Sequence, residues 1–497
     1  MSSNSLNHPG KKLSTRVVHG GFWMFTLQFS ERIFGIIKSV ILARLLAPND
    51  FGLFGIAMLA LATLESFSLI DSHAPLIQKK GNINTYLNTA WVIHVLRGTV
   101  LALIMALGAP LVGRFFGEPK AIMLVRVLAA GIFIQGFQNI GIVYLKKDLE
   151  FHKFFAFKFS GTLANIVVSI TAAFILKDVW ALIYGFLAGE FVMFIASYLL
   201  HPYRPRISVD LGKSKEIFDF SKFIFLQTIV VFLLTQGDDA FVGRILGTTA
   251  LGFYRFAYRL SNFPATGITH VISRVTFPAY SKLQSDKEKL REAVKRTLNF
   301  VSIISIPLAS GIFILAPEFT RVFLGEKWMP MVPAMQVMCA FGAMRAIATA
   351  FESVYRALGR TDIPFKISLT ELLIMAILIY PFSKYFDILG TSIAITLSLV
   401  VILIITIKMI TETLETSFQE LFKSTLFFTG ASIGMILIIW LMKTYLFKNI
   451  NYLYVIFLAA VGVVSFIGLM YIVYTLGLHD KRDINDLKSL FGKLRKK

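Results

Sequence analysis

"RLLAPNDFGLF", at residues 44–54, and "RILGTTALGFY", at residues 244–254, are two versions of one short sequence. Each residue of the second copy lies 200 positions after its counterpart, so that Gly52 matches Gly252 and Phe54 matches Tyr254. Glycine and other small residues at such a place allow a tight reversal between two helices. The pair therefore predicts that the chain builds one structure twice.

The composition is that of an integral membrane protein. Of the 497 residues, 56% are hydrophobic and only 16% are charged, whereas a soluble domain carries about 25% charged residues. Several apolar runs reach the roughly 20 residues that a helix needs to cross a bilayer. The single cysteine, Cys339, lies inside one of these runs and cannot form an intrachain disulfide. The sequence predicts fourteen helical spans, near residues 17–43, 51–73, 87–112, 121–145, 154–176, 179–200, 217–246, 250–278, 294–316, 329–355, 364–386, 388–411, 422–446 and 451–476.

The distribution of positive charge predicts the orientation of the chain. The formal net charge is +21, and lysine and arginine collect in the cytoplasmic loops of membrane proteins. If the N-terminus is cytoplasmic, the loops on that side hold most of the Lys and Arg residues, and the opposite orientation would reverse this bias. We therefore expect a multi-pass protein of the cytoplasmic (inner) membrane with both termini inside. An even number of spans agrees with this topology.

The two copies of the repeated sequence are separated by six spans, so both copies have the same orientation in the membrane. The chain then consists of two parallel six-helix halves followed by two further helices, an arrangement known in transporters. The predicted parts are a cytoplasmic tail (1–16), an N-terminal lobe (17–200), a cytoplasmic linker (201–216), a C-terminal lobe (217–411), two further spans (422–476) and a basic amphipathic tail (477–497). Ser285 and Glu288 have capping-box spacing, which predicts a helix start before the ninth span.

Charged residues inside spans are the candidate functional residues, because each costs about 2.5–3.5 kcal/mol at the bilayer centre. We expect the spans that carry most of them to face one another across a central wet cavity with more cations than anions. Arginine matches phosphate oxygens in a bidentate manner, so such a cavity suits an anionic or diphosphate-bearing substrate. The candidate substrate-binding cations are Arg32, Lys38, Arg97, Arg255, Arg259 and Arg345. The carboxylates that would bind a coupling ion or form structural pairs are Glu31, Glu65, Asp238, Asp239 and Glu352.

The sequence lacks the motifs of nucleotide-binding and metal-binding proteins. The P-loop pattern that cradles nucleotide phosphates is missing, and no His/Cys cluster suggests a metal. The loops predicted for the outer side are short, which weighs against a catalytic domain there. We therefore expect no cofactor, no metal, no nucleic-acid partner and no enzymatic activity.

Longer stretches resemble the Wzx-type oligosaccharide flippases, in the polysaccharide-transporter branch of the multidrug/oligosaccharidyl-lipid/polysaccharide (MOP) exporter superfamily. The nearest subgroup is the one associated with colanic-acid and teichuronic-acid export. The resemblance covers roughly residues 15–480. It is carried by "LARLLAPNDFGLFGIAMLA" (42–60), "PLIQKK" (75–80), "YLKKDLEFHKF" (144–154), "GRILGTTALGFYRFAYRL" (243–260), "SRVTFPAYSKLQSDKEKLR" (273–291) and "LAPEFTRVFLGEKW" (315–328).

This resemblance implies an all-α fold of two six-helix lobes in a V, with two additional C-terminal helices, that opens alternately to either side. It implies a substrate of undecaprenyl diphosphate carrying an oligosaccharide, transport driven by H⁺ or Na⁺, and work beside membrane lipids and the polymerase and chain-length proteins of the same pathway. Two alternatives stay open. One is a drug/cation antiporter of the same superfamily, for which an excess of intramembrane anions would be expected. The other is a membrane polysaccharide polymerase or glycosyltransferase.

Overall fold

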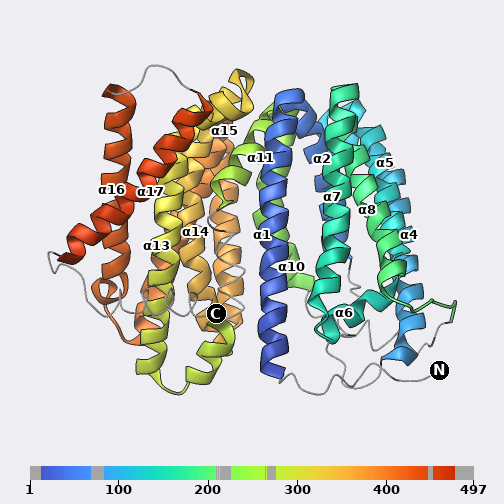
Figure 1. Cartoon of the computed structure of the whole chain (residues 1–497), viewed down its shortest axis with the longest axis horizontal. Helices are drawn as coiled ribbons and strands as arrows, with labels where there is room; N and C mark the ends of the chain where they lie inside the picture. The colour runs from blue at the N-terminus through green and yellow to red at the C-terminus, as the bar shows by residue number, and fades with distance from the viewer. Residues whose placement is uncertain are drawn as a thin grey trace. The chain divides into compact units, whose positions relative to one another are not determined.

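The computed structural model describes residues 13–68, 76, 83–208, 210, 212, 225–263, 265, 276–445 and 451–475. Throughout these residues the regular secondary structure is helical, and they contain no β-strand (Figure 1). The predicted all-α membrane fold is therefore confirmed. The predicted tail 477–497 and most of the predicted tail 1–16 lie outside the described residues.

The chain divides into two compact units. Unit 1 comprises Met1–Phe232 and Gly243–Gly252, and unit 2 comprises Leu233–Val242 and Phe253–Lys497. The division falls inside two helices, α10 (Phe225–Ile245) and α11 (Thr248–Ser261), which form the hairpin that carries the second copy of the repeat. The tip of this hairpin belongs to unit 1, although the residues on both sides of the tip belong to unit 2.

Unit 1 is a bundle in which neighbouring helices pack in pairs. α4 packs along α5, α7 along α8, and α1 along α7. Proline at the first helical position starts both α2 and α5, where its fixed φ suits a helix and its missing N–H has no partner to lose. The helices of this unit are α1 (Leu13–Leu45), α2 (Pro48–Phe67), α4 (Asn84–Phe116), α5 (Pro119–Gly136), η1 (Ile140–Ile142), α6 (Val143–Lys147), α7 (Phe151–Leu176) and α8 (Trp180–Leu200).

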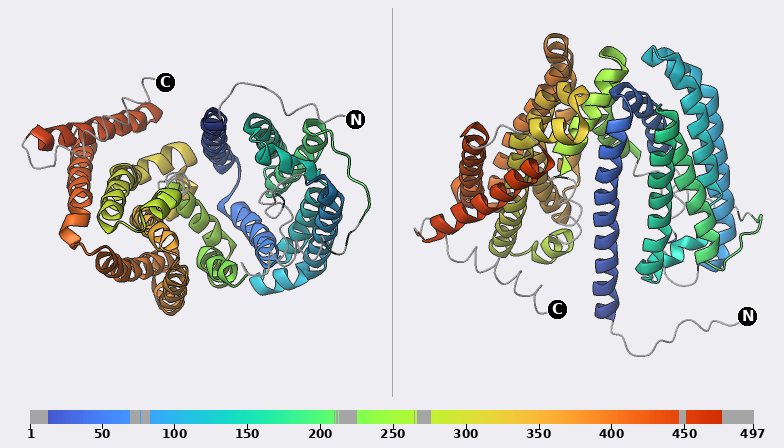
Figure 2. Two further views of the ribbon diagram at one scale, coloured as in Figure 1. Left: turned by 90° about the horizontal axis from the view of Figure 1, so that it is seen from below. Right: turned by 45° about the horizontal axis from the view of Figure 1, so that its top comes forward.

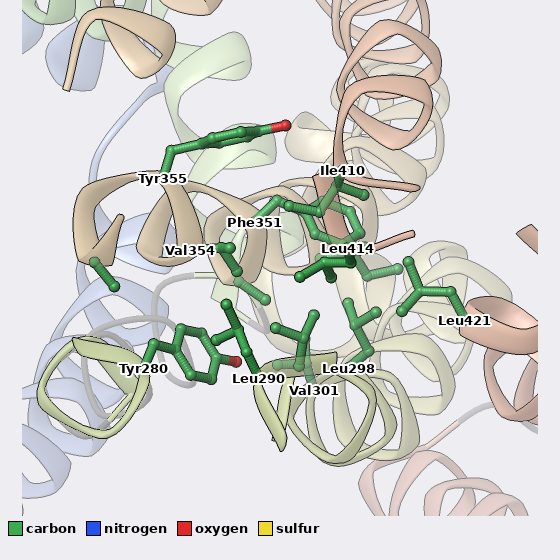
Figure 3. Packing of buried hydrophobic residues seen from close by; sticks show 14 of the residues in the cluster. Tyr280, Leu290, Leu298, Val301, Phe351, Val354, Tyr355, Ile410, Leu414 and Leu421 are labelled. Carbon is green, nitrogen blue, oxygen red and sulfur yellow. The ribbon is translucent and has the colours of Figure 1, made fainter. Parts of the chain in front are cut away.

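Unit 2 is built around the long helices that follow α11. α13 and α14 pack against each other, and α16 and α17 lie on one side of the unit against α13 (Figure 2). Its helices are α13 (Lys287–Phe319), η3 (Thr320–Leu324), η4 (Glu326–Met331), α14 (Val332–Ala357), α15 (Asp362–Leu414), α16 (Phe418–Tyr445) and α17 (Tyr452–Thr475). One end of the unit holds a hydrophobic core, in which Leu290 and Leu298 of α13, Phe351 of α14 and Leu414 of α15 point toward one another (Figure 3).

Ten helices within the described residues are long and apolar enough to cross a membrane. One of them, α15, holds two predicted spans, because the backbone turns sharply at Phe386 and Asp387, between the predicted spans 364–386 and 388–411. The spans predicted near 17–43, 217–246 and 250–278 fall at α1, α10 and α11, which are outside those ten. The total of fourteen stays a prediction.

The predicted helix start near Ser285 is correct in place but wrong in its cap. α13 begins at Lys287, and the Asp286 side chain accepts a hydrogen bond from the Lys289 backbone N–H at 3.1 Å. Aspartate is as good an N-cap as serine, and here the residue one position later takes the role. Lys289 then forms an ion pair of 2.8 Å with the same carboxylate.

Candidate functional site: charged clusters within the two units

Unit 1 contains a group of partly buried cations on three helices. Lys38 of α1 donates a hydrogen bond from Nζ to the Asn165 side-chain oxygen of α7. Arg97 of α4 donates from Nε to the Ser68 hydroxyl, just beyond α2, at 2.6 Å. Each of these two contacts is with a neutral side chain, and the charge of Arg97 also acts on Glu65 of α2.

A third cation of this group, Lys158 on α7, was missed by the sequence analysis. Its ammonium lies 3.9 Å from the Met193 sulfur of α8 and 5.5 Å from the centre of the Phe157 ring. Among the described residues no carboxylate lies within 4.0 Å of it, although its charge acts on Glu31 and Glu190. The sequence did hold a signal, because Lys158 precedes Asn165 by two helical turns and so shares its helix face.

The carboxylates of unit 1 lie next to these cations. The carboxylate of Glu65 on α2 interacts electrostatically with the guanidinium of Arg97. Glu190 of α8 accepts a hydrogen bond from the Gln138 amide at 3.4 Å, and its charge interacts with that of Glu65. Glu190 was not among the candidate site residues. We refer to Glu31, Lys38, Glu65, Arg97, Lys158 and Glu190 as the unit 1 cluster.

Unit 2 contains a second cluster, in which the carboxylates are nearly inaccessible to solvent. Asp238 and Asp239 of α10 are 4% and 8% exposed. Asp238 accepts a hydrogen bond from the Tyr254 hydroxyl of α11 at 2.6 Å. Asp239 pairs with the Arg255 guanidinium, Nε to Oδ2, at 3.5 Å. The structure thus contains the structural pairing between an α11 arginine and an α10 aspartate that the sequence left open.

The same cluster extends to α14. Arg345 donates a hydrogen bond to the Tyr258 hydroxyl and lies 5.7 Å from the centre of the Phe341 ring. Its charge also acts on Asp238 and on Glu371 of α15. We refer to Asp238, Asp239, Tyr254, Arg255, Tyr258, Arg345 and Glu371 as the unit 2 cluster. Tyr254 and Tyr258 were not recognised from the sequence, because tyrosines in an apolar helix do not differ visibly from packing residues.

The remaining predicted residues are Arg32, Arg259 and Glu352, and the charge of Arg255 acts on Arg259. Arg32 is partly buried on α1, and the Arg259 side chain is exposed on α11. Glu352 forms an i, i+4 ion pair with Arg356 near the end of α14, with both side chains exposed. Cys339 is buried on α14.

The two clusters differ in what they can bind. The lysines and the arginine of the unit 1 cluster carry several N–H donors each and can form charge-assisted hydrogen bonds with a phosphate. In the unit 2 cluster, Asp238 already accepts a hydrogen bond from a tyrosine and Asp239 is already paired with an arginine, so each has a partner within the protein. The part of the chain that the structure describes contains no group of three or more His, Cys, Asp or Glu side chains that could hold a metal ion.

The helical architecture and the intramembrane charges define a membrane transporter fold. Residues 41–333 match the model of a family described as "Polysaccharide biosynthesis protein", and the chain belongs to this family. The chain is 27% identical over 374 residues to the lipopolysaccharide biosynthesis protein WzxC of Escherichia coli. This alignment covers 74% of this chain and 75% of WzxC. It is 25% identical over 295 residues to the teichuronic acid biosynthesis protein TuaB of Bacillus subtilis, covering 59% of this chain and 61% of that protein.

Among solved structures, the chain resembles the lipid II flippase MurJ in an inward closed conformation. The TM-score is 0.72 at 17% sequence identity, over 92% of this chain and all of that one. At this identity the match establishes a shared fold. The resemblance to the Wzx-type flippases that the sequence motifs suggested is confirmed by these comparisons.

Proposed function

We propose that this protein is a flippase that moves oligosaccharides linked to polyprenyl (undecaprenyl) diphosphate from the inner to the outer leaflet of the cytoplasmic membrane. Its family membership and its similarity to WzxC and TuaB, both named for the biosynthesis of surface polysaccharides, support a role in building such a polymer. The MurJ-like fold supports transport by alternating access. The topology that the positive charges predict, with both termini cytoplasmic, is part of this proposal.

The observation that carries the proposal is the group of partly buried cations in unit 1, Lys38, Arg97 and Lys158. A diphosphate entering a low-dielectric region needs charge-assisted hydrogen bonds to replace its water. Lys38, Arg97 and Lys158 can provide these bonds, because a lysine carries three N–H donors and an arginine five, more than the contacts with Asn165, Ser68 and Met193 use. An antiporter of cationic drugs would instead need carboxylates with spare charge, and the aspartates of unit 2 are bonded to Tyr254 and Arg255.

We further propose that an inward gradient of H⁺ or Na⁺ drives the cycle through the carboxylates of the two clusters. Each carboxylate lies near a cation of its own unit, so binding of an ion at the carboxylate would change how strongly that cation attracts phosphate. We propose that two lobes, residues 17–200 and 217–411, move as bodies joined by residues 201–216. Their movement would convert the change in phosphate binding into alternating access. We propose transport without catalysis, and partnership with the polymerase of the same pathway.

The test is reconstitution of the full chain into liposomes with a polyprenyl-diphosphate-linked oligosaccharide that carries a fluorophore on its sugar. The measured quantity is the fraction of fluorophore reached by a membrane-impermeant quencher with time. We expect rapid access in proteoliposomes and almost none in empty vesicles. Flipping no faster than in empty vesicles, combined with efflux of a cationic dye, would replace the proposal with the drug antiporter. A longer glycan in the mass spectrum would replace it with the polymerase.

A further inference from the structure

The chain that follows α8 runs along unit 1 as an extended segment. His201 and Arg204 each precede a proline, and a residue before proline is restricted to extended backbone. Side chains of an extended chain alternate between two sides, and over residues 201–206 the odd positions are half-buried against the unit, whereas the even positions are exposed. We refer to residues 201–208 as the strap.

Hydrogen bonds from two places in unit 1 hold the strap. The Asn139 side-chain amide, between α5 and η1, donates to the Tyr203 carbonyl oxygen at 2.7 Å. The Asn88 side-chain oxygen of α4 accepts the Arg206 backbone N–H at 3.0 Å and also accepts the Tyr203 hydroxyl. The strap is therefore docked between the end of α8 and the first turns of α4 (Figure 1).

The strap lies where an apolar surface of unit 1 ends. Phe191, Ile195 and Leu199 are exposed at four-residue spacing along α8, which is the pattern of a helix face in contact with lipid. This stripe stops at Leu199, two residues before the strap begins. The Tyr144 ring stacks on the His201 ring, and tyrosine collects at the membrane–water interface. The strap therefore lies at the depth of the lipid headgroups.

The exposed side of the strap carries two arginines and an isoleucine. Ile207 is 88% exposed, and Arg204 and Arg206 are exposed as well. Arg204 donates from one guanidinium nitrogen to the carbonyl oxygens of His201 and Tyr203, each at 3.0 Å, and three of its five N–H donors lie on its other nitrogens. Within the described residues no carboxylate lies within 4.0 Å of either guanidinium.

The other charges near the strap leave its positive sign intact. Glu150 and Lys153, at the start of α7, both act on His201, but they form an ion pair of 2.9 Å with each other. The Asp210 carboxylate, beyond the strap, accepts the backbone N–H of Gly212 at 3.0 Å. The strap therefore presents two guanidinium charges and one aliphatic side chain to its surroundings.

We propose that Arg204, Arg206 and Ile207 form a binding site for an anionic lipid, with the two guanidinium groups on the headgroup phosphate and the isoleucine among the acyl chains. Guanidinium groups match phosphate oxygens in a bidentate manner, and an exposed aliphatic side chain leaves water when it enters a bilayer. The docked backbone holds both arginines on the same side before the lipid arrives. The topology of the proposed function assigns the site to the inner leaflet, but lipid binding does not depend on transport.

The first test counts bound lipids on the purified full chain by native mass spectrometry, after addition of phosphatidylglycerol or phosphatidylcholine. We expect the chain to retain phosphatidylglycerol in preference. Arg204→Gln combined with Arg206→Gln should weaken this binding about tenfold or more, because each basic residue near an anionic headgroup contributes about fivefold. The matched control combines Arg296→Gln with Arg356→Gln, since these exposed arginines are each paired with a glutamate of their own helix. The control should bind phosphatidylglycerol as the unchanged chain does.

Three results would overturn the site. One is equal affinity of the strap variant and the unchanged chain for phosphatidylglycerol, and another is binding of phosphatidylcholine as tight as that of phosphatidylglycerol. The third is displacement of the lipid by an equal concentration of inorganic phosphate, which would leave a site for a free anion only. The assay uses no lipid-linked sugar, so a chain that binds phosphatidylglycerol at the strap but flips no substrate would keep the site and lose the proposed function.

The second test measures the depth of position 207 in the membrane. A nitroxide is attached to Ile207→Cys in a Cys339→Ala background, and the full chain is placed in vesicles of phosphatidylglycerol. The measured quantity is the ratio of its collision rates with oxygen, which dissolves in lipid, and with a water-soluble nickel chelate. We expect a ratio close to that of Leu199→Cys and several-fold above that of Lys289→Cys, a position whose side chain is 71% exposed. A ratio equal to that of Lys289→Cys would place Ile207 in water and overturn the proposal.

Discussion

The unit 1 and unit 2 clusters contain similar charged residues, but the side chains that these residues contact are different. In unit 2, the aspartates of α10 bond to Tyr254 and Arg255, so the charged groups of the protein satisfy one another. In unit 1, Lys38 contacts Asn165 and Lys158 contacts Met193, while Glu31 and Glu190 interact with the charge of Lys158 from beyond 4.0 Å within the described residues. Removing one member of a buried, bonded group leaves its partner unsatisfied, whereas removing a cation that contacts neutral groups does not. The difference suggests that the unit 1 cluster serves mainly the substrate and the unit 2 cluster mainly the fold or an ion.

The largest expected effect comes from the cation that the sequence analysis missed. Lys158→Met should reduce flipping about tenfold or more, because a hydrogen bond to a charged group contributes about 1.5–3 kcal/mol and 1.4 kcal/mol is about tenfold. The melting temperature should hardly change. The measurement pairs the quencher assay with a thermal melt in detergent.

Lys153→Met, five residues earlier on α7, is the matched control for this variant. Lys153 forms an i, i+3 pair with Glu150 with both side chains exposed, and its loss should leave flipping unchanged. A Lys158→Met protein that flips normally, or one that loses stability instead, would remove the distinction between the clusters.

The second prediction concerns the hydroxyl that bonds to Asp238. Tyr254→Phe retains the ring but removes the donor of the 2.6 Å bond, and an unsatisfied buried acceptor costs about 1–3 kcal/mol. We expect a melting temperature lower by several degrees, measured in detergent. Tyr385→Phe, at a side chain that is 76% exposed, is the control. An unchanged melting temperature for Tyr254→Phe would mean that the unit 2 cluster does not support the fold.

A smaller loss is expected when the ion pair of unit 2 is removed. The Arg255 side chain is 32% exposed and lies 3.5 Å from Asp239, and a glutamine at this position can still donate a hydrogen bond to that carboxylate, so the loss should be about 1 kcal/mol. Arg255→Gln should therefore lower the melting temperature less than Tyr254→Phe does. If it also reduces flipping as strongly as Lys158→Met, Arg255 binds substrate, and the division of roles between the units is less sharp than we infer.

The smallest expected effect is a dependence of stability on pH at the start of the linker. His201 follows α8, its Nδ1 accepts the Tyr203 backbone N–H at 3.2 Å, and its ring stacks on Tyr144. Burial lowers the pKa of the His201 imidazole below its ordinary 6.5, and nearby Lys153 and Arg204 lower it further, against the opposite effect of Glu150.

Because the unfolded chain takes up this proton first, the contribution of neutral His201 is complete above pH 6.5 and is lost as the pH falls toward the lower folded pKa. Melting temperatures measured between pH 7.5 and 5.5 should fall slightly, and His201→Asn should make the decline shallower. An identical decline in the variant would assign the pH dependence to other groups.

Local sequence was sufficient for the helical fold. Apolar runs of the length of α4 or α16 have one stable structure in a bilayer, because only a helix bonds all its own backbone groups there. The same local information predicted the start of α13 to within a residue or two, but not its cap, since Asp286 and Ser285 are equally suitable by type. It also identified α10 and α11 as carriers of charge. These features depend on a few neighbouring residues, which a sequence shows directly.

The sequence by itself determined that the protein is a helical membrane protein, that one hairpin occurs twice, and which helices carry charge. Only the tertiary structure decided which charges meet, as with Asp238 and Tyr254, and that Gly52 and Gly252 pack on the partner copy. These contacts depend on how each helix is rotated about its axis and on how closely two backbones approach. Rotation and approach are set by packing between residues far apart in the chain, and the pattern of any single helix leaves them open.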